Sequence, residues 1–84
     1  MNKNIIITGC AGFIGSHVVD YFLRDNRYNI TGIDKLTYAS SLNNLNAANK
    51  NDKFELIEGD ICDTPTIKKI CLDKRINTIL NFAA

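Results

Sequence analysis

The chain has 84 residues, of which 45% are hydrophobic and 23% charged, and its formal net charge is +1. This balance is typical of a soluble globular protein and gives no reason to expect binding to nucleic acid or to a membrane, since no apolar run approaches the roughly 20 residues of a membrane span. The three cysteines form no Cys-x-x-Cys pair and strand residues begin at Asn4, so we expect no disulfide framework, no metal site, no targeting peptide and a cytoplasmic location.

The most informative stretch is a strand, a turn and a helix in succession. We expect a strand over residues 4–8, in which Ile5–Ile7 form a continuous apolar run, as is typical of a parallel strand covered on both faces. Glycines follow at positions 9, 12 and 15. Gly9 permits a tight turn, Gly12 permits a phosphate to approach the backbone, and Gly15 permits the following helix to lie close to the sheet. The helix dipole and free backbone N–H groups make this turn an anion site, and a dinucleotide pyrophosphate is the expected occupant. An ordinary strand–helix turn with coincidental glycines is the alternative interpretation.

The helix after the glycines is predicted to run from Phe13 to Arg24, with apolar residues at helical spacing. We expect its core face to consist of Phe13, Ile14, Val18, Val19, Phe22 and Leu23. His17 lies in its first turns with no catalytic arrangement around it, and we expect this side chain to be at the surface or partly packed.

A second strand is predicted from Tyr28 to Ile33, and it ends at Asp34. In a dinucleotide site, an acidic residue at this place accepts hydrogen bonds from the adenosine ribose and repels a 2′-phosphate, so Asp34 favours NAD over NADP. The neighbouring Lys35 weakens that preference, because a cation attracts a phosphate. Asp34 lies somewhat further from Gly9 than the usual separation of about 20 residues, and a capping or turn role is the alternative interpretation.

The rest of the chain continues to alternate helices and strands. We predict a short helix from Ser40 or Ser41 to Ala48, a strand over Phe54–Glu58, a helix capped by Asp63 or Thr64 with a buried stripe of Ile67, Ile70 and Cys71, and a strand over Thr78–Phe82. The order β-α-β-α-β-α-β implies right-handed crossovers and an α/β fold with a Rossmann-like, doubly wound parallel sheet. In this sheet the first three strands fill one half, and the fourth begins the other.

The length indicates how much of such a domain is present. A complete doubly wound nucleotide-binding domain takes on the order of 150 residues, whereas this chain has 84 and stops directly after a strand. We therefore expect residues 1–84 to be the N-terminal part of an NAD(P)-binding Rossmann domain, without the catalytic remainder or a substrate domain. We also expect marginal stability, because the fourth strand leaves an open edge and one face of the sheet lacks helices.

Three segments resemble the extended short-chain dehydrogenase/reductase family, and most closely its dTDP-glucose 4,6-dehydratases. They are residues 8–17, residues 34–45, and residues 58–63 together with the final Asn-Phe-Ala-Ala. The glycine motif by itself indicates only the superfamily. The segment Asp-Lys-Leu-Thr-Tyr-Ala at 34–39 is more specific and is typical of sugar dehydratases rather than of the related epimerases.

The resemblance implies NAD as cofactor and places the motif residues around it. Backbone N–H groups of the glycine loop would bind the pyrophosphate, Asp34 and the three residues after it would form the adenosine ribose end, and Asp60 with Ile61 would contact adenine. The last three residues would pass beneath the ribose and nicotinamide. The predicted cofactor site therefore comprises Gly9, Gly12, Phe13, Ile14, Gly15, Asp34, Lys35, Leu36, Thr37, Asp60, Ile61, Phe82, Ala83 and Ala84.

The reaction implied by the resemblance removes water from a nucleotide-activated hexose. NAD takes a hydride from sugar C4, water leaves across C5 and C6, and the hydride returns to C6. The family's Tyr-x-x-x-Lys pair and Asp-Glu pair do not occur in this sequence. We therefore predict no catalytic residue within the chain and no activity of the 84 residues alone.

The full-length protein is expected to be an NAD-dependent lyase, a homodimer, that acts on a nucleotide sugar bound mainly by residues outside this chain. Another extended family member, such as a UDP-sugar 4-epimerase or a decarboxylase, is one alternative. A non-catalytic nucleotide-binding module is the other.

Overall fold

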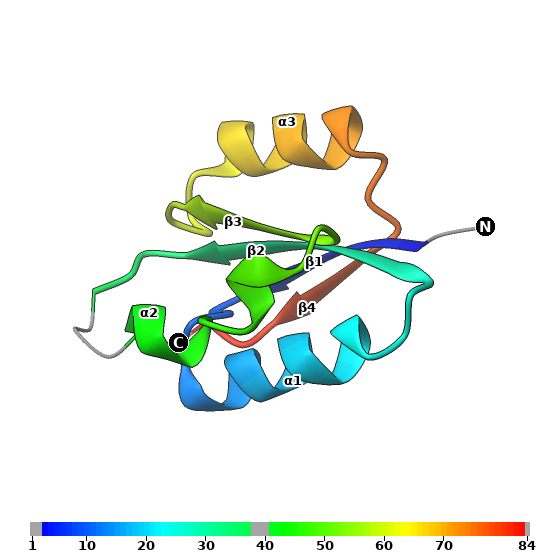
Figure 1. Cartoon of the computed structure of the whole chain (residues 1–84). Helices are drawn as coiled ribbons and strands as arrows, with labels where there is room; N and C mark the ends of the chain where they lie inside the picture. Colours follow the sequence, from blue (N-terminus) through cyan, green and yellow to red (C-terminus); the bar gives the residue numbers. More distant parts are fainter. Residues whose placement is uncertain (1–2, 38–40, 84) are drawn as a thin grey trace.

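The computed structural model describes residues 3–37 and 41–83. Its four strands are β1 (Lys3–Thr8), β2 (Tyr28–Asp34), β3 (Phe54–Glu58) and β4 (Thr78–Asn81). They form one parallel sheet in the order β3-β2-β1-β4 (Figure 1). The doubly wound order predicted from the sequence is confirmed: β1 is central, and the direction of winding reverses between β1 and β4, which is where ligands bind in open α/β sheets.

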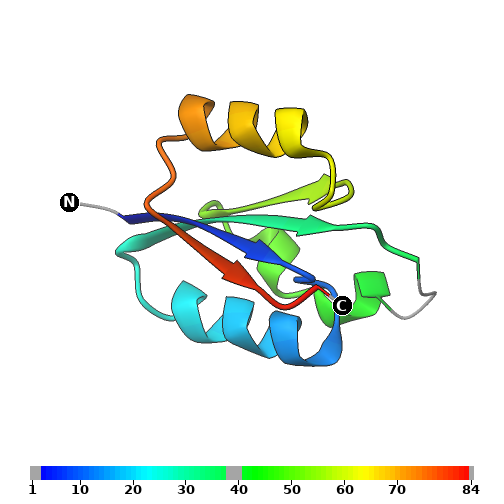
Figure 2. The ribbon, with the colours of Figure 1, turned by 180° about the vertical axis from the view of Figure 1, so that it is seen from behind.

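Helices cover both faces of the sheet. Helices α1 (Phe13–Leu23) and α2 (Ser41–Asn44) lie on one face, and α3 (Thr64–Asp73) lies on the other (Figures 1 and 2). The expectation that one face lacks helices is therefore wrong, because the crossover from β3 to β4 carries α3 over it. None of the helices in the described part of the chain has the length and apolarity that crossing a bilayer requires.

The main core lies between α1 and the sheet. It contains Ile5 and Ile7 of β1, Ile30 of β2, Val19 of α1 and Leu45, all buried. On the opposite face of the sheet, Ile6 and Ile33 are also buried. The continuous apolar run of β1 is thus explained by burial on both faces, which is what a central parallel strand requires.

The core face of α1 differs from the prediction at its first turn. Val18, Phe22 and Leu23 pack against the core as predicted, but Phe13 and Ile14 are 72% and 61% exposed. Gly15 and Ser16 occupy the inward positions of that turn instead and are buried. The helix begins so close to the glycine loop that only small side chains fit on its inner side.

The segment after β2 contains less helix than predicted. In place of one helix ending at Ala48, the structure has the four residues of α2 and a 3₁₀ turn, η1, at Ala48–Lys50. Leu45 and Ala48 are nevertheless buried. Asparagine competes with the backbone for hydrogen bonds and is a weak helix former, which accounts for the interruption. Ser40 lies outside the described residues.

Helix α3 has the predicted start but not the predicted burial. Asp63 is its N-cap, and its carboxylate accepts hydrogen bonds from the backbone N–H of Thr66 at 3.4 Å and from its hydroxyl at 2.7 Å. The stripe of Ile67, Ile70 and Cys71 is only half-buried. The helix therefore covers its face of the sheet less closely than α1 covers the other.

Candidate cofactor site

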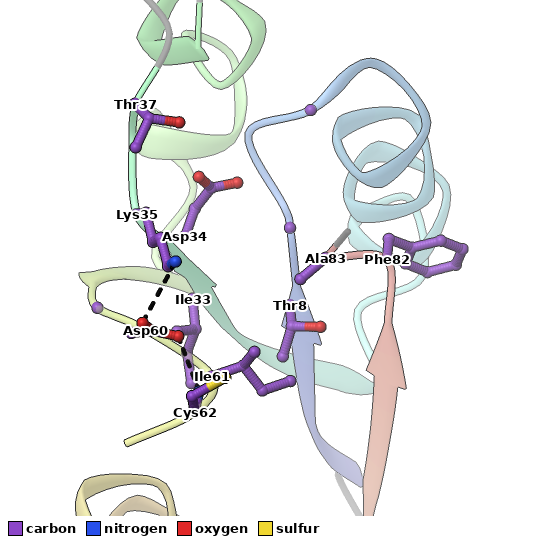
Figure 3. Close-up of a pocket in the computed structure, with 13 residues that line it drawn as sticks. Thr8, Ile33, Asp34, Lys35, Thr37, Asp60, Ile61, Cys62, Phe82 and Ala83 are labelled. Carbon is purple, nitrogen blue, oxygen red and sulfur yellow. Dashed lines mark hydrogen bonds and ion pairs between the residues drawn. The ribbon is translucent and has the colours of Figure 1, made fainter. Parts of the chain in front are cut away.

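A pocket of about 460 Å³ opens at the carboxyl edge of the sheet, within the usual size range of ligand pockets. All four strand ends contribute to it (Figure 3). Its lining residues are Thr8, Gly9, Gly12, Ile33, Asp34, Lys35, Thr37, Gly59, Asp60, Ile61, Cys62, Phe82 and Ala83. Nine of the predicted site residues are among them. Thr8, Ile33, Gly59 and Cys62 were not among the predicted site residues. The first three lie at or directly after strand ends, which is the one signal that could have indicated them, and Cys62 lies in the turn before α3.

The three glycines of the loop differ in the space that a Cβ atom would have. Gly9 has φ = +66°, and a Cβ there would lie 2.6 Å from the backbone nitrogen of Ala83. At Gly12 a Cβ would have the Gly9 carbonyl at 3.4 Å as its nearest neighbour, so the pocket side of Gly12 is open. A Cβ at Gly15 would overlap the Gly9 carbonyl. Gly15 therefore allows α1 to approach the loop, rather than the sheet as predicted.

The first turn of α1 offers unpaired backbone donors beside the pocket. Gly12 is the N-cap residue, and no side chain caps the helix. The N–H groups of Phe13, Ile14 and Gly15 have no partner within the helix, because an α-helix leaves its first donors free. None of these three predicted site residues is among those that line the pocket, which Gly12 borders just before them. What they offer is limited to these donors and to the helix dipole, which together favour an anion.

Asp34 connects the end of β2 to the glycine loop. One carboxylate oxygen accepts a hydrogen bond from the N–H of Ala11 at 2.9 Å, and the other from the N–H of Leu36 at 2.8 Å. The alternative interpretation of Asp34 as a turn residue is therefore correct in part. The carboxylate also lines the pocket, where its remaining lone pairs can accept from a ligand's hydroxyl groups.

Leu36 does not line the pocket, contrary to the prediction. It has φ = +57°, in the left-handed region, and its side chain packs against the core. The Leu36 N–H donates to the Asp34 carboxylate. Thr37 follows it and returns to the pocket wall.

Lys35 and Asp60 form an ion pair on one side of the pocket, with Nζ and Oδ2 3.3 Å apart (Figure 3). The other Asp60 oxygen accepts a hydrogen bond from the N–H of Cys62 at 2.8 Å. The Cys62 N–H and, next, the Lys35 ammonium lower the pKa of Asp60 below its ordinary value. Asp60 is therefore held both in position and in its charged form.

The segment after β4 is tied to β1. The N–H of Phe82 donates to the carbonyl of Thr8 at 3.0 Å, and the side-chain oxygen of Asn81 accepts from the Thr8 hydroxyl at 2.5 Å and from the Ala83 N–H at 3.1 Å. These bonds hold the Phe82–Ala83 backbone against Gly9. Asn81 thus positions this segment, and the sequence indicated it only as part of a motif. Ala84 lies outside the described residues.

The two cysteines near the pocket should react differently. Burial, and then the Asp34 charge, raise the pKa of the Cys10 thiol from 9.0 to about 12, whereas Cys62 is exposed. We expect iodoacetamide at pH 8 to label Cys62 in minutes and Cys10 only after unfolding, as measured by peptide mass spectrometry. Because the folded state keeps the Cys10 proton and the unfolded state loses it, stability should fall as pH rises from 9 towards 12. Equal labelling of both cysteines in the folded chain would contradict this geometry.

A model of the family described as GDP-mannose 4,6 dehydratase matches residues 6–84. The chain belongs to this family. The match covers almost the whole chain, and it agrees with the resemblance to extended short-chain dehydrogenases/reductases found in the sequence.

The relatives of this chain within the family are named for different nucleotide sugars. It is 42% identical to the trifunctional UDP-glucose 4,6-dehydratase/UDP-4-keto-6-deoxy-D-glucose 3,5-epimerase/UDP-4-keto-L-rhamnose-reductase of Arabidopsis thaliana, over 98% of the chain and 12% of that protein. It is 39% identical to the human dTDP-D-glucose 4,6-dehydratase, over 98% of the chain and 24% of the enzyme. The chain thus spans a quarter or less of the length of these relatives.

Solved structures of similar proteins agree with the fold. The dTDP-glucose 4,6-dehydratase of Bacillus anthracis, in complex with NAD, has a TM-score of 0.92 at 35% identity, covering 98% of this chain and 27% of that one. The UDP-glucuronic acid 4-epimerase of Bacillus cereus, also in complex with NAD, has a TM-score of 0.86 at 31% identity, covering 98% and 27%. The chain therefore shares its fold with NAD-binding members of the dehydratase and epimerase group.

Proposed function

We propose that the chain is the NAD-binding part of a nucleotide-sugar 4,6-dehydratase that acts on dTDP-glucose. The observation that carries the proposal is the meeting of two features in one pocket. The first is a glycine loop that leads into the uncapped N-terminus of α1. The second is the Asp34 carboxylate at the end of the neighbouring strand. A dinucleotide needs both features, the first for its pyrophosphate and the second for its adenosine ribose.

The shape of the pocket and the hydrogen-bonding groups around it both fit NAD. A Cβ at Gly12 would have only the Gly9 carbonyl near it, so a phosphate can reach the backbone there. Within residues 3–37 and 41–83, the first N–H groups of α1 donate to no other group. The Asp34 carboxylate lines the pocket beyond the loop. Backbone donors suited to an anion and a carboxylate suited to a diol thus lie at different places around the same pocket.

Within this function the chain binds and orients, and the hydride chemistry is supplied by bound NAD. The N–H groups of α1 stabilise the negative pyrophosphate. The Asp34 carboxylate accepts from the ribose hydroxyls. The Phe82–Ala83 backbone, held by Asn81, forms the floor next to Gly9. Proton transfer and the elimination of water are assigned to residues outside this chain.

The choice of substrate rests on the relatives. The Bacillus anthracis and human relatives are both named as dTDP-glucose 4,6-dehydratases. The segment Asp-Lys-Leu-Thr-Tyr-Ala at 34–39 also resembles that of sugar dehydratases. A 4-epimerase of a UDP-sugar is a second candidate, which the likeness to the Bacillus cereus epimerase supports. In the dehydratase a 6-deoxy-4-keto sugar is formed, whereas an epimerase returns an isomer of its substrate.

The proposal is tested by denaturing the purified chain, and the whole enzyme that contains it, and identifying the released nucleotide by chromatography. Incubation of the whole enzyme with dTDP-glucose then tests the reaction. We expect NAD from both preparations, loss of water from dTDP-glucose by the whole enzyme, and no turnover by the 84 residues alone. Release of no nucleotide, together with no binding of added NAD, would contradict the proposal.

A further inference from the structure

The ammonium of Lys35 lies at the end of the pocket where NAD and NADP differ. Lys35 follows Asp34 directly, and both residues line the pocket. NADP carries a 2′-phosphate on the adenosine ribose, next to the hydroxyl groups that we assign to Asp34. A free ammonium at this place would attract that phosphate and oppose the repulsion from Asp34.

The structure pairs this ammonium with a carboxylate from another strand. Lys35 follows β2, whereas Asp60 follows β3, and the two side chains meet at 3.3 Å (Figure 3). The N–H of Cys62 donates to Asp60 at 2.8 Å, which fixes the side of the carboxylate away from Lys35. The ammonium therefore meets a positioned anion before any ligand binds.

We propose that Asp60 is a specificity residue that makes the pocket reject NADP by neutralising Lys35. The inference rests on the proposed function and deepens it. With Asp60 in place, the charged side chains that line this end of the pocket are Asp34, Lys35 and Asp60, with a net charge of −1. Without Asp60 the net charge is zero, and the ammonium is free to meet a 2′-phosphate. The repulsion between Asp34 and the 2′-phosphate is then opposed by the attraction of the unpaired Lys35.

The test compares the affinities of NAD and NADP for the 84-residue chain and its D60N variant by isothermal titration calorimetry. The ratio of the two affinities is the readout, because any lost contact between Asp60 and adenine affects both nucleotides equally. We expect D60N to shift the ratio towards NADP by about tenfold, the size expected for one newly unpaired charge near a phosphate of nearly two charges in a water-exposed site. The shift should shrink at high salt, where charges are screened.

Two further variants separate the proposed cause from other effects. The double variant D60N/K35M removes the ammonium as well and should return the ratio to near that of the unmodified chain. The control D73N removes a charge from the exposed C-terminal end of α3 and should leave the ratio unchanged. Circular dichroism confirms that each variant is folded.

The outcomes distinguish the two proposals. If the unmodified chain binds neither nucleotide, the proposed function is wrong. If it binds NAD and the ratio does not move in D60N, or moves equally in D60N/K35M, then Asp60 does not act through Lys35 and this inference is wrong. A shift in D60N that the second substitution abolishes supports it.

Discussion

Replacing Gly9 with alanine is expected to destabilise the fold by about 3–5 kcal/mol and to abolish NAD binding. Two independent costs add at this position. The residue has φ = +66°, a conformation that L-residues adopt only with strain, and a Cβ would lie 2.6 Å from the Ala83 nitrogen. Neither neighbour can move easily, since Phe82 is hydrogen-bonded to Thr8. Urea denaturation followed by circular dichroism measures the loss.

Gly59 offers a matched control for that measurement. It also lies at the pocket, but a Cβ added there would meet no atom within 4 Å, and its φ is not positive. We expect Gly59→Ala to change stability by less than about 1 kcal/mol, with the sign favouring the folded state. Similar denaturation midpoints for the Gly9 and Gly59 variants would show that the loop does not depend on the close approach of β4.

Replacing Asp34 with alanine is expected to weaken NAD binding at least about 100-fold, because hydrogen bonds to a charged group contribute roughly 1.5–3 kcal/mol each. The substitution removes the proposed acceptor for the ribose. It also leaves the N–H groups of Ala11 and Leu36 without their partner, so the glycine loop and the turn after β2 lose a common anchor. Isothermal titration calorimetry measures the affinity, and we expect a stability loss of about 2 kcal/mol alongside it.

Glu58 provides the corresponding control. It ends β3 directly opposite Asp34 in the strand register and is exposed, but it does not line the pocket. Glu58→Ala therefore removes the same charge at the same edge of the sheet without touching the site. If this variant weakens NAD as much as Asp34→Ala, general charge at the edge, and not the Asp34 carboxylate, controls binding.

The sequence allowed prediction of those features that are local in the chain. The run before Gly9 and the acidic residue that ends β2 identified two neighbouring strand ends, and the alternation of elements fixed their order in the sheet. Each of these signals needs only the periodicity and turn chemistry of a few consecutive residues.

Features that depend on contacts between distant segments were not predictable in the same way. The apolar character of Phe13 and Ile14 indicated a core position, but the close approach of α1 to the loop leaves room there only for Gly15 and Ser16. Leu36 takes a left-handed conformation and packs its side chain against the core, while its N–H donates to Asp34. Sequence spacing reveals neither of these packing constraints.

The ion pair between Lys35 and Asp60 illustrates the same limit. Lys35 was expected to weaken the preference for NAD, because its partner was not visible in the sequence. Asp60 follows a different strand, and only the pairing of β2 with β3 brings the two side chains together. The pairing changes the expected effect of Lys35 on cofactor choice.

The central claim, that this pocket binds NAD, is tested most directly by NMR titration of the isotope-labelled chain. NAD is added while the backbone amide resonances are followed. We predict saturable shifts that are largest at Phe13, Ile14 and Gly15, whose N–H groups we assign to the pyrophosphate, and at Leu36, whose N–H donates to the Asp34 carboxylate. Shifts throughout α3 should be small. The absence of shifts at millimolar NAD, or shifts concentrated in α3, would contradict the account.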